Sequence, residues 1–528
     1  MNLTKVDDGK LLTELTASYN SAKRDADLWE SILEASYHYA VPFRNRFYSP
    51  KQFQGELKNT RLYDTTAVEA AKTFVSKIHT AMTPPQVQWG FLQVNKSEFG
   101  DAPQSQIDDA QRKVDEYMRE LFRYIHRSNF DTVINECYFD LSIGTSCLII
   151  NQHTEKQPLL FTSIPADKLA IAEGLDGRAH IWFRTWEDIK VRELKSRWKK
   201  ASKSADMESA LLSDPNAKVA KIYEGVLYDP NQAKPYTYAV WCGDHLIFAE
   251  DLDSNPAIVW RFQKTNNEVW GRGPVMEALP SIISLQEIAR IELASANLNT
   301  FKPYMGFSDG VFNPYTFKLE PFTVIPIAPI GTGGQLPLVP LPDSSAPQFT
   351  QLVSSDLRMQ IKTLMFATDG SESESIQPQT ATEVSINQQN LAQKIGPLFS
   401  RLQSEFLEPV IQRVSYILDK MGILPKPMIN GKEVSFEYKS PLALAQGQQQ
   451  VGVFTQFTQL LQGISGPEMT QIYLDTEEVP WLLAELMQVD ERFLNSREKV
   501  AAGLEKLQAQ GEAQQEAEAQ EAAQSEAQ

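Results

Sequence analysis

Residues 61–92 read RLYDTTAVEAAKTFVSKIHTAMTPPQVQWGFL, and no other segment of the chain constrains its structure as closely. Asp64 or Thr65 can cap a helix, because side-chain oxygens of these residue types accept hydrogen bonds from free N–H groups. Pro84 and Pro85 end it, since the residue before a proline avoids the helical conformation. Apolar residues recur between them at helical spacing: Ala67, Ala70, Phe74, Ile78 and Met82. The segment predicts an amphipathic helix followed by a buried aromatic, Trp89.

Length and composition indicate a globular protein with two to four domains. The chain has 528 residues, of which 42% are apolar and 22% charged. It has no stretch of about 18 apolar residues and no leader-like start, so we expect a protein made and kept in a cytoplasm. Its three cysteines, Cys137, Cys147 and Cys242, are too scattered for a disulfide framework and are interpreted as buried small apolar residues.

The formal net charge of −17 argues against a protein that grips nucleic acid, because ion pairing with phosphates needs a basic face. It does not exclude a conduit for DNA, since strong phosphate ligands would hold a duplex that has to move. The simpler interpretation of the charge is good solubility.

The first 145 residues are predicted to be mainly helical, with one or two helices before Pro42 and others at 103–126 and 130–142. A β-rich insert follows at about 146–262, interrupted by a helix near Trp186 to Ala201. Within it, Lys199, Lys200 and Lys203 form a small basic cluster, interpreted as a solvated helix face. The short runs that predict the strands are 146–151, 159–164, 179–185, 220–228, 236–242, 245–249 and 258–262.

Two helices, at 274–299 and 351–366, flank a segment that cannot be a long helix. Residues 303–347 contain nine of the 30 prolines, which favours strands and turns there. After the second helix, Asp369 to Ser375 is small, polar and acidic, as in a mobile loop.

A long helix is then predicted from a capping box at Thr380 and Glu383 to about Met421, kinked at Gly396-Pro397 and Glu408-Pro409. A short strand near 434–438 and a helical region at 447–507 follow. Residues 508–528 are almost all Ala, Gln and Glu and predict a frayed or disordered tail.

Motifs for catalysis or cofactor binding are weak. The chain has no phosphate-binding Gly-x-x-x-x-Gly-Lys-Ser/Thr loop, and its six histidines never lie within five residues of one another. Gly271-Arg272-Gly273 lacks the third glycine of a dinucleotide-binding turn. We therefore expect no catalytic, cofactor or metal site and no enzyme.

The motifs, taken together, resemble the portal (head-to-tail connector) proteins of short-tailed double-stranded DNA phages. The Tyr-Asp-Thr-Thr-Ala opening at 63–67 with Thr-Pro-Pro at 83–85 and Trp89 is one match. The others, in the family's order, are TNNEVWGRGP at 265–274, TATEV at 380–384 with IGPL at 395–398, and SPLA at 440–443. The resemblance covers about residues 10 to 445.

The resemblance implies an α+β, mostly helical portal fold with wing, stem, clip and crown regions, assembled as a ring of about twelve subunits. On that plan 1–273 is the wing, 274–301 and 351–366 are the two stem helices, and 302–350 is the clip. The remainder divides into the channel loop at 367–379, the kinked wing helix and strand at 380–446, the crown at 447–507 and the tail at 508–528.

The resemblance also implies a channel for double-stranded viral DNA at one capsid vertex of the virion, assembled in the host cytoplasm. Arg358 and Lys362 on the second stem helix are candidates for a basic ring, or are simply exposed charges. The implied partners are the terminase motor, major capsid and scaffolding proteins, and tail adaptor or nozzle and internal core proteins, with no membrane. The implied channel loop is Asp369, Gly370, Ser371, Glu372, Ser373, Glu374 and Ser375, whose two glutamates favour sliding over holding.

Two other classes of protein remain open. A helical capsid or tail adaptor without a DNA channel would share the composition, and a closed ring wide enough for a duplex would distinguish the two. An enzyme would have to assemble its site from scattered residues.

Overall fold

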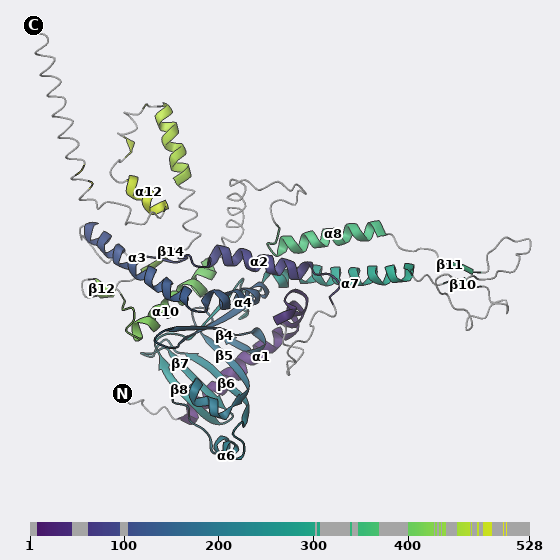
Figure 1. The fold of residues 1–528 in the computed structure, drawn as a ribbon, viewed down its shortest axis with the longest axis horizontal. Coiled ribbons are helices and arrows are strands. Elements are labelled where there is room, and N and C mark those ends of the chain that lie inside the picture. The colour runs from purple at the N-terminus through teal and green to yellow at the C-terminus, as the bar shows by residue number, and fades with distance from the viewer. Residues whose placement is uncertain are drawn as a thin grey trace, which may run out of the picture.

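A computed structural model describes residues 8–44, 62–94, 104–300, 304–306, 338–340, 347–368 and 400–426, with short pieces at 428–429, 432–433, 436–439, 451–464, 466, 473–474, 479–487, 500 and 503. The described chain is mostly helical and carries antiparallel sheets (Figure 1). Two long helices, α7 and α8, project side by side from the body.

The N-terminal part is helical, as the sequence predicts. A single long helix, α1 (Asp8–Ala40), ends before the 3-10 turn η1 (Pro42–Arg44). It is followed by α2 (Thr66–Met82), α3 (Gln104–Arg127) and α4 (Phe130–Ile143). All five predicted apolar residues of α2 are buried, and Trp89 is 1% exposed.

The β-rich insert forms two antiparallel sheets. In the smaller sheet, β2 (Thr145–Gln152) lies between β3 (Leu159–Ser163) and β9 (Ala257–Arg261). The larger sheet runs in chain order through five strands. These are β4 (Leu169–Ala172), β5 (Ile181–Lys190), β6 (Lys218–Tyr228), β7 (Tyr236–Cys242) and β8 (His245–Leu252).

The predicted helix near Trp186 to Ala201 is wrong over most of its length. Strand β5 continues through Lys190, because Trp186 pairs with Ile222 and Lys190 with Lys218 on β6. Only the 3-10 turn η4 (Val191–Glu193) and the single turn α5 (Leu194–Arg197) are helical there. The short helix α6 (Ala205–Ser213), which Ser204 caps, was not predicted.

The predicted pair of flanking helices is confirmed as α7 (Pro274–Thr300) and α8 (Pro347–Leu364). Between them, β10 (Tyr304–Gly306) and β11 (Leu338–Pro340) pair antiparallel. The rest of the proline-rich segment lies outside the described residues.

The predicted bend at Glu408-Pro409 coincides with a change of helix type. A π-helical turn (Gln403–Leu407) passes into α10 (Glu408–Lys420) immediately before Pro409, which has no N–H to donate. The earlier part of this predicted helix, 380–399, lies outside the described residues.

The C-terminal strands and helices are short. The strand expected near 434–438 is β14 (Phe436–Lys439), which pairs with β1 (Phe91–Val94). A small hairpin joins β12 (Met428–Ile429) and β13 (Lys432–Glu433). Of the predicted region 447–507, residues 451–464 and α12 (Val479–Met487) are helical.

The buried apolar residues form two large clusters. One lies between the apolar face of α2, helices α3, α4 and α10, and the three-stranded sheet. The other lies between α1, the five-stranded sheet and the roots of α7 and α8. Helix α2 contributes to both and so joins the two cores. Within the described residues, no helix combines the length and apolar character that a membrane span needs.

Candidate functional site

The predicted channel residues divide between described and undescribed parts of the chain. Arg358 and Lys362 lie on α8, whereas the loop Asp369 to Ser375 lies outside the described residues. The geometry that bears on a channel is therefore that of α7, α8 and the segments that hold their roots.

Asp64 binds the second projecting helix. Its Oδ2 accepts a hydrogen bond from Arg358 Nε at 3.0 Å and lies 2.9 Å from Nη2 in an ion pair, while its Oδ1 accepts a hydrogen bond from Thr66 N at 2.8 Å. Burial alone would raise the pKa of Asp64, but the hydrogen bonds from Thr66 and the Arg358 charge hold it below its ordinary value. Asp64 therefore binds the first backbone N–H of α2 and is also the ion-pair partner of α8.

Gln286 attaches the first projecting helix to the same segment. Its side-chain oxygen accepts hydrogen bonds from Tyr63 N at 2.8 Å and Asp64 N at 3.1 Å, and its amide nitrogen donates to Asp64 O at 2.5 Å. The amide satisfies three backbone groups that would otherwise be buried without partners. The Tyr-Asp-Thr motif is thus the point at which α2, α7 and α8 are joined.

Arg358 does not offer an unpaired charge. Its side chain is 44% exposed, and its guanidinium forms an ion pair and one hydrogen bond with the buried Asp64 carboxylate. Lys362, one turn further along α8, is half-buried. The basic ring remains a prediction, and the Asp64 pair lowers the positive charge that Arg358 would present to DNA.

Helix α8 ends at Leu364, and the chain leaves it through a left-handed residue, Phe366. Phe366 has φ +55°, Ala367 N donates to Lys362 O at 2.7 Å, and Phe366 N donates to Thr363 O at 3.2 Å. This is a Schellman ending, in which glycine is the usual left-handed residue. Here the Phe366 ring packs against Phe74 and Phe262 instead. The next residues are held too, since Lys77 Nζ on α2 donates to Thr368 O at 3.0 Å.

The other helix, α7, starts where two backbone segments touch. Gly271 N donates to Thr145 Oγ1 at 2.8 Å, and a Cβ at Gly273 would lie 2.4 Å from Ser142 O. A Cβ at Gly144 would lie 2.1 Å from Gly271 O. The glycines of the Trp-Gly-Arg-Gly-Pro motif are therefore required for close backbone packing against the end of α4. This packing role agrees with their spacing, which is not that of a phosphate-binding turn.

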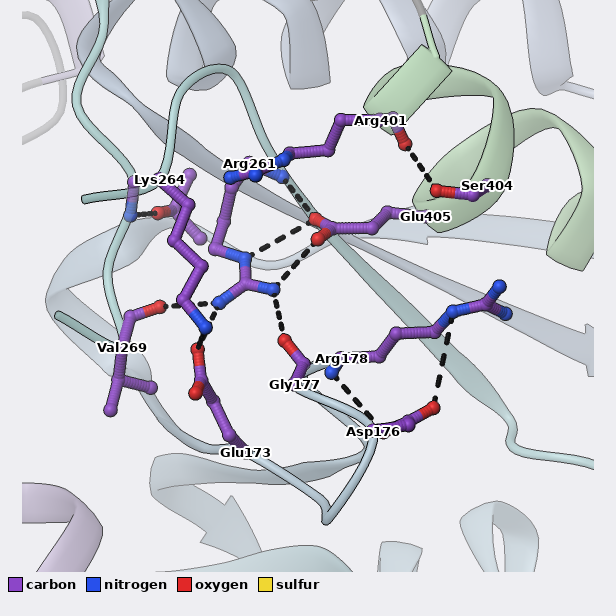
Figure 2. A network of polar contacts seen from close by, with 12 residues as sticks. Glu173, Asp176, Gly177, Arg178, Arg261, Lys264, Val269, Arg401, Ser404 and Glu405 are labelled. Atoms are coloured by element: carbon purple, nitrogen blue, oxygen red, sulfur yellow. Dashed lines mark hydrogen bonds and ion pairs between the residues drawn. The ribbon is translucent and has the colours of Figure 1, made fainter. Parts of the chain in front are cut away.

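Arg261, the last residue of β9, joins this strand to the π-helical turn (Gln403–Leu407) through hydrogen bonds. Arg261 is completely buried, and its Nε and Nη2 donate to the Glu405 carboxylate at 3.2 and 2.7 Å (Figure 2). Nη2 also donates to Gly177 O at 2.7 Å, while Nη1 donates to Val269 O at 3.1 Å and to the carboxylate of Glu173. All five guanidinium protons have acceptors.

Burial and the two carboxylates act on the pKa of Arg261 in opposite directions. Burial would lower the pKa of Arg261, but Glu405 and Glu173 raise it above its ordinary value. Glu173 also pairs with Lys264 at 2.6 Å. This network was not predicted from the sequence, where its only signal is an arginine at the end of an apolar strand.

These arrangements join elements and carry no reactive group. Burial raises the pKa of the Cys137 thiol to about 12, so it stays protonated and unreactive, and Cys147 is likewise buried, whereas Cys242 is only half-buried. No three His, Cys, Asp or Glu side chains of the described residues gather as they would around a metal ion.

Comparisons with known proteins give one family. The family described as bacteriophage head to tail connecting protein matches residues 12–494. A curated relative, the probable portal protein of Bordetella phage BPP-1, is 22% identical over 471 residues, which cover 82% of this chain and 79% of the relative.

Two solved structures show weak similarity in fold. One is the virion of a native gene transfer agent particle, with a TM-score of 0.32, 13% identity and coverage of 78% of this chain and 93% of that chain. The other is the neck of an empty gene transfer agent particle, with a TM-score of 0.35, 12% identity and coverage of 80% and 90%.

Proposed function

The chain belongs to the family of bacteriophage head to tail connecting proteins, and from this premise we propose that it is a portal protein whose copies close into a ring around a DNA channel. The family match spans residues 12–494, and a curated relative of similar length carries the name probable portal protein. The proposed assembly is a ring of about twelve copies at one capsid vertex of the virion, formed in the host cytoplasm.

The proposed role is to pass viral double-stranded DNA into the procapsid and later out of it. The ring would dock the terminase motor during packaging and the tail afterwards, with capsid, scaffolding and internal core proteins around it. We infer no catalytic role for this chain, so ATP hydrolysis would belong to the motor. The segment between α7 and α8, residues 302–350, is the proposed clip that meets these partners.

One observation carries the proposal: α7 and α8 project from the body and expose large apolar side chains. Ile291 and Leu293 on α7 are 52% and 53% exposed, and Leu352 and Met359 on α8 are 68% and 53% exposed. We take these exposed side chains on a projecting pair of helices as the basis of an interaction surface. In a ring, neighbouring copies would cover them.

The electrostatics support a conduit. Arg358 is already paired with Asp64, the proposed channel loop contains Glu372 and Glu374, and the chain carries a net charge of −17. A channel with few unpaired cations adds little salt-dependent holding energy to a moving duplex.

Electron microscopy of single particles of the purified protein tests the proposal. We expect closed rings with a central hole of roughly 20 to 40 Å, wide enough for a B-form duplex whose grooves alone are about 12 and 6 Å wide. Deleting residues 369–375 should leave the rings intact and impair DNA packaging. A monomer, or an open filament at every salt concentration, would overturn the channel and favour an adaptor without one.

A further inference from the structure

A basic surface lies on the β-rich insert, away from the proposed channel. Residues 190–203, from the end of β5 through η4 and α5, hold seven basic residues and one acidic residue, Glu193, in a chain of net charge −17. Helix α6, the next element, lies at the end of the sheet far from α7 and α8 (Figure 1). The seven basic residues are Lys190, Arg192, Lys195, Arg197, Lys199, Lys200 and Lys203.

The fold extends this surface to a second strand. Lys190 on β5 is the direct register partner of Lys218 on β6, and the next residue, Val191, donates its N–H to Ala217 O at 2.9 Å. Like charges directly opposite on neighbouring strands are destabilising. The register therefore places two lysines directly opposite each other, an arrangement that disfavours this strand pairing.

A second pair of like charges lies nearby. The Arg184 and Arg197 guanidinium carbons lie 3.7 and 4.7 Å from the centroid of the Trp186 ring. Burial first, and then the charge of Arg197, lower the pKa of Arg184, whose buried Nε has no hydrogen-bond partner. Glu224 raises that pKa, but its carboxylate oxygens accept hydrogen bonds from Trp186 and Tyr238.

Counter-ions are scarce on this surface. The acidic residues closest in sequence are Glu187 and Asp188 just before the segment, Glu193 within it, and Asp206, Glu208 and Asp214 at α6; Glu187 pairs with Lys168, outside this surface. In the described part of the chain, the only ion pair that any of them makes with this surface joins Arg197 and Glu193 at 3.9 Å. Lys195, Lys199, Lys200 and Lys218 are all exposed.

The exposed part of the segment is charged without an apolar anchor. Its large apolar residues, Val191, Leu194 and Trp198, are buried under the basic ones. Protein interfaces draw much of their energy from buried aromatic and apolar anchors, whereas binding to a phosphate backbone needs only arrayed cations.

We propose that this surface, formed by residues 190–203 and Lys218, binds the phosphate backbone of duplex DNA outside the channel. This second binding site goes beyond the proposed function, and it rests on that function only for the presence of duplex DNA beside the ring. Lysines act here as point charges on flexible stems, so binding is independent of sequence and sensitive to salt.

Covalently closed circular duplex DNA tests the proposal, because a closed circle cannot thread a closed ring. The patch variant replaces Lys195, Lys199, Lys200 and Lys218 by Gln. The matched control replaces four other exposed lysines, Lys10, Lys72, Lys113 and Lys156, by Gln, so both variants lose the same charge. Binding is measured over a salt series, with particles from the same samples imaged.

We expect the patch variant to bind circles more weakly than the control, with the slope of log K against log salt reduced by up to about 3.6 for four contacts. Removing Lys218 also removes the repulsion with Lys190, so thermal unfolding should show no loss of stability.

Equal binding by the patch variant and wild type, or equal weakening in both variants, overturns the proposal. If the patch variant binds circles normally but no longer binds polyglutamate, the proposal is also overturned, and the surface is assigned to an acidic protein partner. Patch-dependent binding by a chain that forms no rings would contradict the proposed function alone.

Discussion

At the scale of single residues, Asp64 explains why a short motif can matter to two distant helices. Its carboxylate accepts hydrogen bonds from Thr66 and Arg358, while its backbone N–H and C=O are both bound by Gln286. Gln286 lies 222 residues from Asp64 along the chain and Arg358 lies 294 residues away. The motif thus starts α2 and fixes the roots of α7 and α8 together.

Replacing Asp64 by Asn should destabilise the protein by about 1–2 kcal/mol at pH 7, because the charged pair with Arg358 is lost while an oxygen remains for Thr66 N. The pKa of Asp64 is lowered in the folded protein. The contribution of its charge is therefore present above the unfolded-state pKa, about 3.9, and is lost as pH falls through the lower folded pKa. Urea unfolding at pH 7 and then at steps below about pH 4 should show the two proteins converging.

The matched control is Asp419→Asn, an exposed carboxylate on α10. That substitution should change the free energy of unfolding by no more than about 0.5 kcal/mol at any of these pH values. A difference between wild type and Asp64→Asn that stayed constant through acid would show that the ion pair contributes nothing.

The same scale shows what the sequence alone could predict. The helix start near Asp64 or Thr65 and the burial of Trp89 follow from local rules: the N-cap of α2 is Thr65, with Asp64 Oδ1 accepting from Thr66 N, and Trp89 is buried. The Arg261 network could not be predicted, because Glu173 and Glu405 lie 88 and 144 residues away from Arg261. Glu405 belongs to the segment that resembles the portal family's kinked helix, yet its partner is set only by tertiary packing.

At the scale of elements, the end of α8 sets the direction in which the chain enters the proposed channel loop. The left-handed residue there is Phe366. A glycine would adopt this conformation without strain, but it would lack the contacts that the Phe366 ring makes with Phe74 and Phe262. A non-glycine residue in this conformation costs about 1–2 kcal/mol. The packing of the Phe366 side chain offsets that cost and fixes the direction in which the chain leaves α8.

Substitutions at Phe366 should separate packing from backbone strain. Phe366→Ala and Phe366→Gly lose the same ring contacts, but only Gly relieves the left-handed backbone, so the Gly variant should be more stable by about 1 kcal/mol. At exposed Thr363, inside α8, the order should reverse, with Ala favoured over Gly by about 1 kcal/mol. Denaturant unfolding of the four variants measures both differences. Ala equal to or better than Gly at position 366 would contradict the strain argument.

Elements also show where periodicity fails as a predictor. The helices at 103–126, 130–142 and 274–299 are confirmed, because their apolar residues recur at helical spacing and caps or prolines bound them. Residues 186–190 were expected to be helical but extend β5, since cross-strand partners on β6 override local preference. Strand β1 was missed because its partner β14 lies more than 300 residues away.

At the scale of the whole molecule, the described chain separates a compact body from a projecting pair of helices. The body contains both large apolar cores, which α2 joins through Phe74 in one and Ala71 in the other. The pair exposes large apolar side chains that the single chain leaves uncovered. A ring interface joins two different surfaces of neighbouring copies, so that a fixed rotation between copies closes the assembly.

Charges placed on the projecting pair should block assembly without unfolding the subunit. Ile291→Lys with Leu352→Lys introduces two ammonium groups at side chains that are 52% and 68% exposed. Because both positions are exposed in the single chain, its free energy of unfolding should change by no more than about 1 kcal/mol in total. In a ring the same groups would be buried without partners, at several kcal/mol each, so rings should give way to monomers. Light scattering after size exclusion, with electron microscopy, measures the change.

The control, Leu175→Lys with Leu212→Lys, charges two side chains of the β-rich insert that are 95% and 89% exposed, and it should leave assembly unchanged. Rings formed equally well by both variants would mean that α7 and α8 face solvent in the assembly, and the apolar surface would then need another occupant.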